Sequence, residues 1–162
     1  QTIYTATKYT EGFITVLSPE ETRKKNIFQI FEDVINKEGK NPNQMEKIVE
    51  YKVSYSNDYD KAFQSATFWR STLIENIFNL SIENPQKLQE KAIKDVSDET
   101  IKKSIQITTS IQEIIKSIEE YFKVGYTKVY IHSSSPDEIE FVRDIGKKVL
   151  SYFTIKYEKG SL

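Results

Sequence analysis

Apolar residues along the chain fall into two kinds of pattern. Short continuous runs rich in β-branched and aromatic residues predict buried strands. Longer stretches with apolar residues three or four positions apart predict amphipathic helices. The predicted strands cover residues 12–17, 45–55 and 127–133, and the main predicted helices cover residues 19–38, 58–69, 110–125 and 136–153. Strands that alternate with helices are typical of a parallel α/β protein with right-handed crossovers.

Capping residues mark the predicted helix boundaries. Ser18 is followed by Pro19 and two acidic residues, so it is expected to be the N-cap of a helix with proline in its first turn and acidic residues that interact favourably with the helix dipole. Gly39 is a typical residue for the end of this helix. Ser135 and Pro136 repeat this pattern after the last predicted strand, so Ser135 is expected to cap the final helix. The recurrence fits a β/α barrel, in which each strand passes through a loop into an outer helix.

Composition narrows the class of protein. The 162 residues carry a formal net charge of −1, which gives no long-range attraction to nucleic acid or to an anionic membrane. Without cysteine the chain has no disulfide, thiolate metal site or cysteine nucleophile, as expected of a cytoplasmic protein or of a protein from a hot environment. A single histidine cannot build a metal site, and no apolar run is long enough to span a bilayer.

The expected organisation is one domain over residues 1–157, with a helical insert at about 58–104 after the second strand. Short helical pieces, separated by Asn84-Pro85 and by a capping signal at Ser97, fill this insert. Residues 158–162 are expected to be a disordered tail or a vector-derived scar.

Few residues stand out as candidates for chemistry, since the chain has no Gly-rich phosphate loop, nucleophile elbow or diagnostic carboxylate pair. His132 ends a predicted strand, where it could face an active-site mouth or be a structural histidine. The pair Phe68-Trp69 could form the wall of a pocket, or belong to the core or a dimer interface. Ser133 to Ser135 could donate hydrogen bonds to a phosphate, or Ser135 could simply cap a helix.

Four segments resemble, in order and approximate spacing, the bacterial-luciferase-like superfamily, in particular the oxidoreductases that use coenzyme F-420 (F420, 8-hydroxy-5-deazaflavin) and are similar to glucose-6-phosphate dehydrogenase. The segments are "ATKYTEGFITV" (6–16), "KVSYSNDYDKAFQSATFW" (52–69), "SIENPQKLQEKAIKDVSDETIKKS" (81–104) and "YFKVGYTKVYIHSSSPDEIEFVRDIGKKVLSYF" (121–153). The resemblance implies the C-terminal part of a (β/α)8 TIM barrel, with about three parallel strands and outer helices.

The resemblance also implies which functions this chain supports. It would be the C-terminal portion of an enzyme that transfers a hydride between F420 and a small molecule, and would shape the substrate side of the pocket. The family's catalytic residues would lie in the N-terminal half, so no catalytic residue is expected here. F420 is the cofactor expected in the complete enzyme, FMN is the alternative, and this chain alone could bind neither.

Three positions correspond to residues around the family's substrate. His132 matches a histidine and Trp69 an aromatic pair of the family, while Lys103 keeps the positive charge of a family arginine. A family lysine falls near Asn79, and the family's phosphate-binding turn is replaced at Val16 to Ser18. The resemblance therefore predicts substrate contacts from Trp69, Lys103 and His132, without fixing a sugar phosphate as the substrate.

An open part of a barrel is expected to expose two sheet edges and an inner apolar face. The expected partner is therefore the missing N-terminal half of the barrel or a second copy of the chain. The alternative function is a noncatalytic remnant that forms a homo-oligomer without cofactor.

Overall fold

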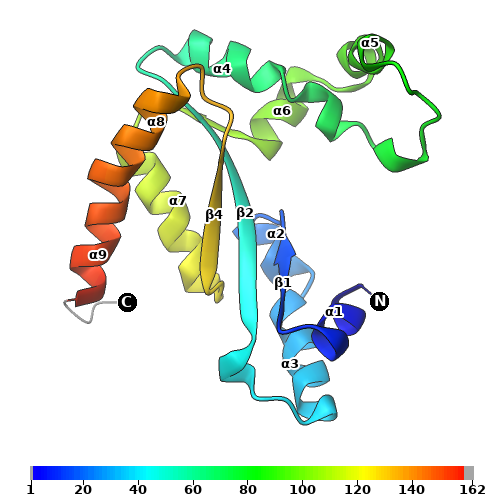
Figure 1. Cartoon of the computed structure of the whole chain (residues 1–162), viewed down its shortest axis with the longest axis vertical. Coiled ribbons are helices and arrows are strands. Elements are labelled where there is room, and N and C mark those ends of the chain that lie inside the picture. Colours follow the sequence, from blue (N-terminus) through cyan, green and yellow to red (C-terminus); the bar gives the residue numbers. More distant parts are fainter. Residues whose placement is uncertain (1, 159–162) are drawn as a thin grey trace. The chain divides into compact units, whose positions relative to one another are not determined.

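The structure is a computed structural model that describes residues 2–158, with side chains excepted at Thr2, Asn43, Tyr157 and Glu158. The chain forms two compact units (Figure 1). One contains the residues up to Tyr51 together with Ile115–Ile131, and the other contains Lys52–Ile114 together with the residues from His132 onward. Because the chain passes between the units several times, the expected single domain over residues 1–157 stays a prediction.

The first unit is built on three neighbouring strands. Strand β1 (Gly12–Thr15) pairs in parallel with the start of β2 (Glu46–Tyr55), with Ile14 opposite Ile48. Strand β4 (Lys128–Ser133) pairs with the other edge of β2, where Thr127 N donates to Lys47 O at 2.8 Å. A Cβ at Gly12 would collide with the backbone of Glu46, so glycine permits the close approach of β1 and β2.

Three helices of the first unit precede β2. They are α1 (Thr2–Tyr9), α2 (Pro19–Lys24) and α3 (Ile27–Glu38), followed by the short turn η1 (Pro42–Gln44). Ser18 caps α2 in a reciprocal pair with Glu21, as predicted. The prediction of one continuous helix from Pro19 to Gly39 is wrong, because Asn26 adopts a left-handed conformation with φ 49° and separates α2 from α3.

Helices cover one face of these strands. Phe13 of β1 contacts Phe28 and Phe31 of α3, with ring centroids 6.2 and 5.0 Å apart. Tyr51 of β2 lies against Tyr121 of α7 (Ile111–Val124), with ring centroids 5.7 Å apart. The core cluster beside α3 contains Phe31, Ile35 and Met45, with Ile3 and Phe13 packed against it.

The opposite face of these strands carries both apolar and charged side chains. Ile14 and Tyr130 are 56% and 52% exposed there. Glu46 and Ile48 are two positions apart on β2, so their side chains lie on the same face. Lys128 of β4 forms an ion pair with Glu46, which places Lys128 on this face as well. Charged and apolar residues therefore share this face, and the expected inner apolar face of an open barrel stays a prediction.

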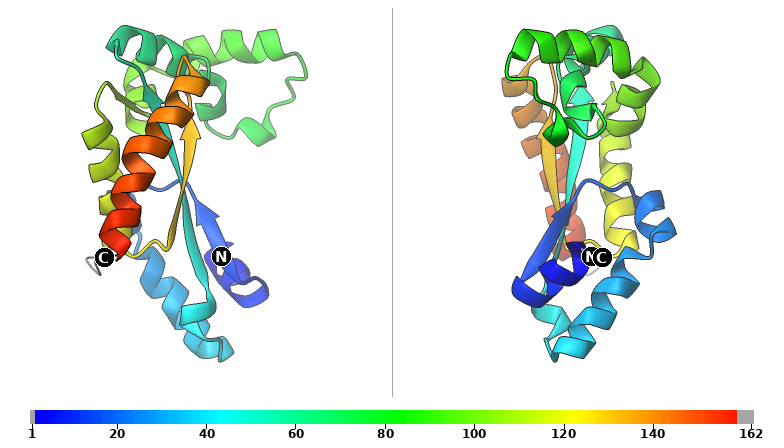
Figure 2. Two further views of the ribbon diagram at one scale, coloured as in Figure 1. Left: turned by 60° about the vertical axis from the view of Figure 1, so that its left-hand side comes forward. Right: turned by 90° about the vertical axis from the view of Figure 1, so that its right-hand side faces the viewer.

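The second unit contains the end of β2 and the helical insert that follows it (Figure 2). Val53 to Tyr55 pair in parallel with β3 (Gln106–Thr108), the short strand after the insert. The insert contains α4 (Tyr59–Thr67), η2 (Arg70–Leu73), η3 (Ile77–Asn79), α5 (Pro85–Asp95) and α6 (Asp98–Ser104). It has a core cluster of its own, formed by Ala66, Ile74, Ala92, Val96, Ile101 and Ile105.

The described residues end in a helical rod, which is seen from α8 to α9 in the left view of Figure 2. It consists of α8 (Glu138–Asp144), the π-helical segment η4 (Ile145–Leu150) and α9 (Ser151–Glu158). The prediction that Ser135 caps this helix is wrong: Asp137 is the N-cap and accepts a hydrogen bond from Glu140 N at 2.8 Å. The predicted tail beyond Glu158 lies outside the described residues. No described helix is long and apolar enough to cross a bilayer.

Candidate functional site

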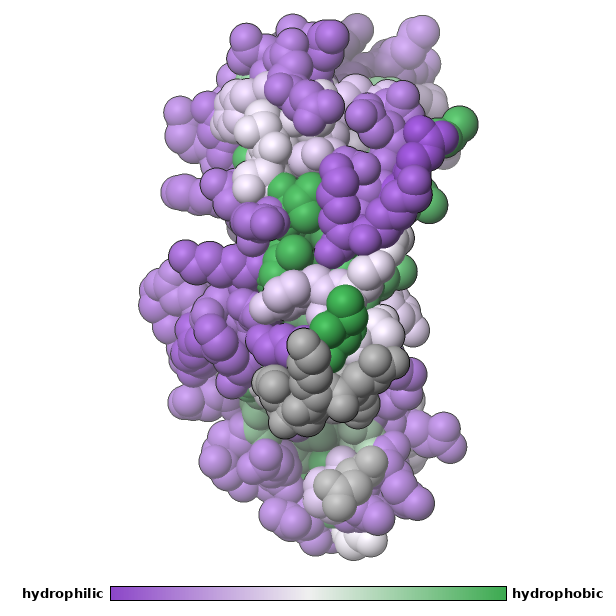
Figure 3. All heavy atoms as spheres, turned by 90° about the vertical axis from the view of Figure 1, so that its left-hand side faces the viewer, coloured by the Kyte–Doolittle hydropathy of each residue, from purple (hydrophilic) through white to green (hydrophobic). Residues whose placement is uncertain are grey.

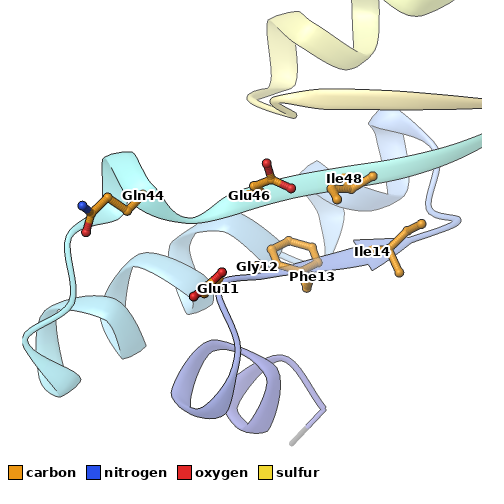
Figure 4. A pocket seen from close by; sticks show the side chains of 7 residues that line it. All are labelled: Glu11, Gly12, Phe13, Ile14, Gln44, Glu46 and Ile48. Atoms are coloured by element: carbon orange, nitrogen blue, oxygen red, sulfur yellow. The ribbon is translucent and has the colours of Figure 1, made fainter.

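An open cavity of about 420 Å³ lies in the first unit, beside the starts of β1 and β2. Figure 4 shows Ile14 and Ile48 next to each other on its wall, with Glu46 nearer the start of β2. Its remaining lining residues are Glu11, Gly12, Phe13 and Gln44. Gly12 and Glu46 are the first residues of their strands, whereas barrel enzymes bind substrate at the carboxyl ends of the strands. The cavity is therefore not the best candidate for a substrate site.

The contact between Trp69 and His132 lies in the second unit. Trp69 follows α4, and His132 is near the carboxyl end of β4. The two rings meet edge to face, with centroids 4.7 Å apart and an interplanar angle of 89°. The structure thus brings together two of the three residues that the sequence predicted for substrate contact.

Trp69 is fixed by packing within the insert. Its side chain packs against the core cluster of the insert, while Phe68 beside it is 75% exposed. The two rings lie nearly perpendicular, with centroids 6.1 Å apart. Trp69 therefore contributes to a core, whereas Phe68 is exposed, and a role of the pair as the wall of a pocket stays a prediction.

Two basic side chains of the insert contact other residues of the insert, and Lys103 is exposed. Arg70 donates to Val96 O and forms an ion pair with Asp98, which fixes η2 to the start of α6. Lys102 lies over the Phe63 ring at 5.0 Å from its centroid. Lys103, the third predicted contact residue, is exposed on α6. Its role in binding substrate stays a prediction.

Serine hydroxyls join the ends of the strands in this unit. Ser54 Oγ donates toward two carbonyl oxygens, Ala62 O at 2.7 Å and Ser134 O at 2.8 Å. Ser135 Oγ accepts from Tyr55 N at 3.0 Å, and Ser133 Oγ accepts from Ser135 N at 3.1 Å. These bonds hold the loop after β4 against β2. Within residues 2–158, Ser134 Oγ is buried without a hydrogen-bond partner.

Tyr55 connects the same strand end to the final helix. Its hydroxyl donates to Asp144 Oδ2 at 3.2 Å, and Lys148 Nζ donates to the same oxygen at 2.8 Å. Burial, followed by the hydrogen bond to Asp144, raises the pKa of Tyr55. The hydrogen bond from Lys148 lowers the pKa of Asp144, which keeps its carboxylate charged and the tyrosine protonated.

Phe68, Trp69 and His132 are joined by successive ring contacts in the second unit, and we call these three residues the aromatic edge. The described residues contain no group of three or more His, Cys, Asp or Glu side chains placed to hold a metal ion. Sequence reasoning missed the bonds of Ser54 and Tyr55, because pairs so far apart in the chain leave no local signal.

Two solved structures similar to this chain are F420-dependent enzymes. An F420-dependent secondary alcohol dehydrogenase, solved with an F420-acetone adduct, is 30% identical with a TM-score of 0.71, over 83% of this chain and 41% of that protein. The F420-dependent tetrahydromethanopterin reductase from Methanopyrus kandleri is 18% identical with a TM-score of 0.68, over 93% of this chain and 48% of that protein. The predicted fold class, part of a luciferase-like TIM barrel, is confirmed.

Curated relatives are F420-dependent glucose-6-phosphate dehydrogenases. The protein from Microbacterium testaceum is 24% identical over 146 residues, which are 90% of this chain and 43% of that protein. The protein from Mycolicibacterium gilvum is 25% identical over 133 residues, 82% of this chain and 39% of that protein. No family model matches the chain. The resemblance to F420-dependent oxidoreductases is confirmed, and the chain spans about two-fifths of the length of these relatives.

Proposed function

We propose that this chain is the C-terminal portion of an F420-dependent oxidoreductase, in which it forms the substrate side of the pocket. The contact between Trp69 and His132 supports this role, because it sets an aromatic surface and an imidazole near the carboxyl end of a barrel strand. The similarity to F420-dependent enzymes over 83% of the chain supports the reaction class. When bound, F420 would carry the hydride to or from the substrate carbon.

The residues of this chain would bind and orient the substrate. Trp69 and Phe68 would pack against its apolar part, and the ring of His132 would lie beside them. Contacts to the deazaflavin would come from the rest of the barrel, in the same polypeptide or in a partner.

The test combines this chain with the N-terminal barrel portion of a relative, which is the portion that this chain does not cover. The resulting complex is titrated with F420 and, separately, with FMN. We expect saturable binding of F420. In the active complex, Trp69→Ala and His132→Ala should raise the substrate KM by about tenfold or more and leave the F420 affinity unchanged. Phe78→Ala is the matched control, because Phe78 is 100% exposed in the same insert. Absence of F420 binding by the complete barrel would overturn the proposal, and binding of FMN alone would assign a flavin enzyme.

A noncatalytic homo-oligomer is the second candidate. It is favoured by the uncovered face of the strands in the first unit, where Ile14 and Tyr130 are more than half exposed. A stable oligomer of this chain that takes up neither F420 nor FMN, even with the rest of a barrel supplied, would support this second function.

A further inference from the structure

The cavity beside the starts of β1 and β2, which we call the β1–β2 cavity, has two chemically different ends. Figure 4 shows Ile14 and Ile48 together at one end, and Glu11 and Gln44 toward the starts of the strands. Ile14 and Ile48 are opposite each other in the paired strands, and Ile14 is 56% exposed. Because Glu11 and Ile14 are three positions apart, the polar and apolar ends are separated by at most about 10 Å along the chain.

Exposed apolar side chains on the final helical rod are arranged differently. Ile139 and Val142 of α8 are 74% and 67% exposed. Figure 3 shows apolar side chains between hydrophilic ones on the side where α8 and α9 lie in Figure 1. Scattered side chains of this kind are normal on a protein surface. In the β1–β2 cavity, by contrast, apolar and polar side chains converge on one hollow, which is typical of a ligand site.

The charge of the β1–β2 cavity selects a cation. Both charged residues that line it, Glu11 and Glu46, are acidic. Glu46 is already paired with Lys128 of β4, which does not line the cavity. Among residues 2–158, the carboxylate of Glu11 and the side-chain amide of Gln44 form no hydrogen bond or ion pair. The cavity therefore offers one unpaired carboxylate, and its complement is a single positive charge.

An aliphatic monocation matches both ends of the β1–β2 cavity. Its hydrocarbon chain would lie on Ile14 and Ile48 while its charged group reached Glu11, in the way that the stems of lysine and arginine lie along apolar surface. The side-chain carbonyl oxygen of Gln44 would accept a further hydrogen bond from the same group. An aliphatic anion would meet two carboxylates instead, and a neutral chain would leave Glu11 without a partner.

We propose that the β1–β2 cavity binds an aliphatic monocation, a primary amine or a guanidine, with its charged group at Glu11 and Gln44 and its chain on Ile14 and Ile48. This inference goes beyond the proposed function, because it concerns a ligand site in the first unit and uses none of the residues that would contact substrate. A free molecule and the side chain of a lysine or arginine from another polypeptide present the same chemistry, and the last test separates them.

The first test titrates the chain by calorimetry with hexylamine, butylamine, 1-hexanol and hexanoate at neutral pH. We expect hexylamine to bind at one site with a dissociation constant of about a millimolar, which suits so small a ligand. Butylamine should bind about fivefold more weakly or less, because two fewer methylene groups are buried. The alcohol and the carboxylate should bind at least about tenfold more weakly. Absence of saturable hexylamine binding, or equal binding of the alcohol or the carboxylate, would overturn the proposal.

Glu11→Gln tests the charged end of the β1–β2 cavity. Hexylamine should bind about fivefold more weakly to this variant, because it has lost the unpaired carboxylate. The matched control is Glu32→Gln, because Glu32 is exposed on α3 in the same unit and does not line the cavity. The free energy of unfolding should change little in either variant, since both residues are exposed. Equal affinity of the two variants for hexylamine would overturn the proposal.

Lys128→Gln gives a test that loss of folding cannot imitate. This change frees the carboxylate of Glu46, so the cavity gains a second unpaired negative charge. Hexylamine should then bind about threefold more tightly, and added salt should reduce this gain. Unchanged or weaker binding would overturn the placement of the cation at this end of the cavity.

The last test identifies the source of the cation. Hexylamine is titrated into the chain together with the N-terminal barrel portion of a relative. Retained hexylamine binding would identify a free amine as the ligand. Displacement of hexylamine, with weaker association of the barrel portion to Glu11→Gln than to the unchanged chain, would identify a basic side chain of that portion. F420 binding by the complex is measured separately, so failure of the proposed function would leave this result unaffected.

Discussion

Three tyrosines form a ring cluster in the first unit. Tyr121 lies 5.7 Å from Tyr51 and 5.8 Å from Tyr126, measured between ring centroids, and all three are buried. Tyr126 also shares a hydrogen bond of 2.8 Å with Thr22 of α2. Burial raises the pKa of Tyr121 to about 12, because an ionised phenol would lose hydration inside the cluster.

Tyr121 should make the protein sensitive to alkali. Its pKa is higher in the folded state than in the unfolded state, so its contribution to stability is complete below pH about 10 and is lost as the pH rises toward about 12. Tyr121→Phe should reduce this loss and lower the slope of unfolding free energy against pH in that window. Denaturant unfolding measured at neutral pH and at several alkaline values tests this. An unchanged alkaline slope would contradict it.

Local signals at single residues predicted some contacts and missed others. Ser18 was predicted correctly as a cap because its partner Glu21 is only three positions away. Ser135 was not, because Asp137 is an equally good cap and the amide of Tyr55 uses the Ser135 hydroxyl. The choice between Ser135 and Asp137 depends on the position of β2 beside the loop after β4, which the local sequence does not contain.

At the scale of elements, the insert depends on its own small core. Ile101 of α6 is fully buried in the cluster that also contains Ala66 and Ala92, and Trp69 packs against this cluster. The position of the aromatic edge therefore depends on the packing of α4, α5 and α6.

Ile101→Ala should destabilise this unit strongly. Removal of a buried isoleucine side chain to the β-carbon costs about 2–5 kcal/mol, because a cavity remains. Ile93→Ala is the matched control: Ile93 is exposed on α5, and its loss should change the free energy of unfolding by less than about 0.5 kcal/mol. Denaturant unfolding followed by the fluorescence of Trp69 measures both. Equal effects of the two changes would disprove the assigned packing.

The longer strands and most helices could be predicted from hydrophobic period, because these elements repeat their pattern, whereas β3 has only three residues and gives no such signal. The interruption at Asn26 could not, since residues 20–26 are all polar and carry no apolar period in which a break would show. The resemblance singled out Trp69 and His132 one by one, but their contact could not be predicted, because 62 residues separate them in the chain.

At the scale of the whole molecule, the uncovered face of β1, β2 and β4 should govern solubility. Ile14 and Tyr130 are more than half exposed, so they contribute little to the folded chain on its own. Ile14→Thr with Tyr130→Thr should slow aggregation on heating and change the free energy of unfolding by less than about 1 kcal/mol. Turbidity and denaturant unfolding measure the two effects. Faster aggregation, or a large loss of stability, would show that these side chains are already buried in an assembly.

Trp69 is the only tryptophan of the chain, and it belongs to the second unit, whereas the ring cluster of Tyr51, Tyr121 and Tyr126 belongs to the first. The chain thus carries two natural optical probes, one in each unit. Tryptophan emission reports the unfolding of the insert, and near-ultraviolet circular dichroism of the tyrosine cluster reports the first unit. Transitions that coincide would mean that both units unfold as one cooperative body, and transitions that separate would reveal an intermediate in which one unit persists without the other.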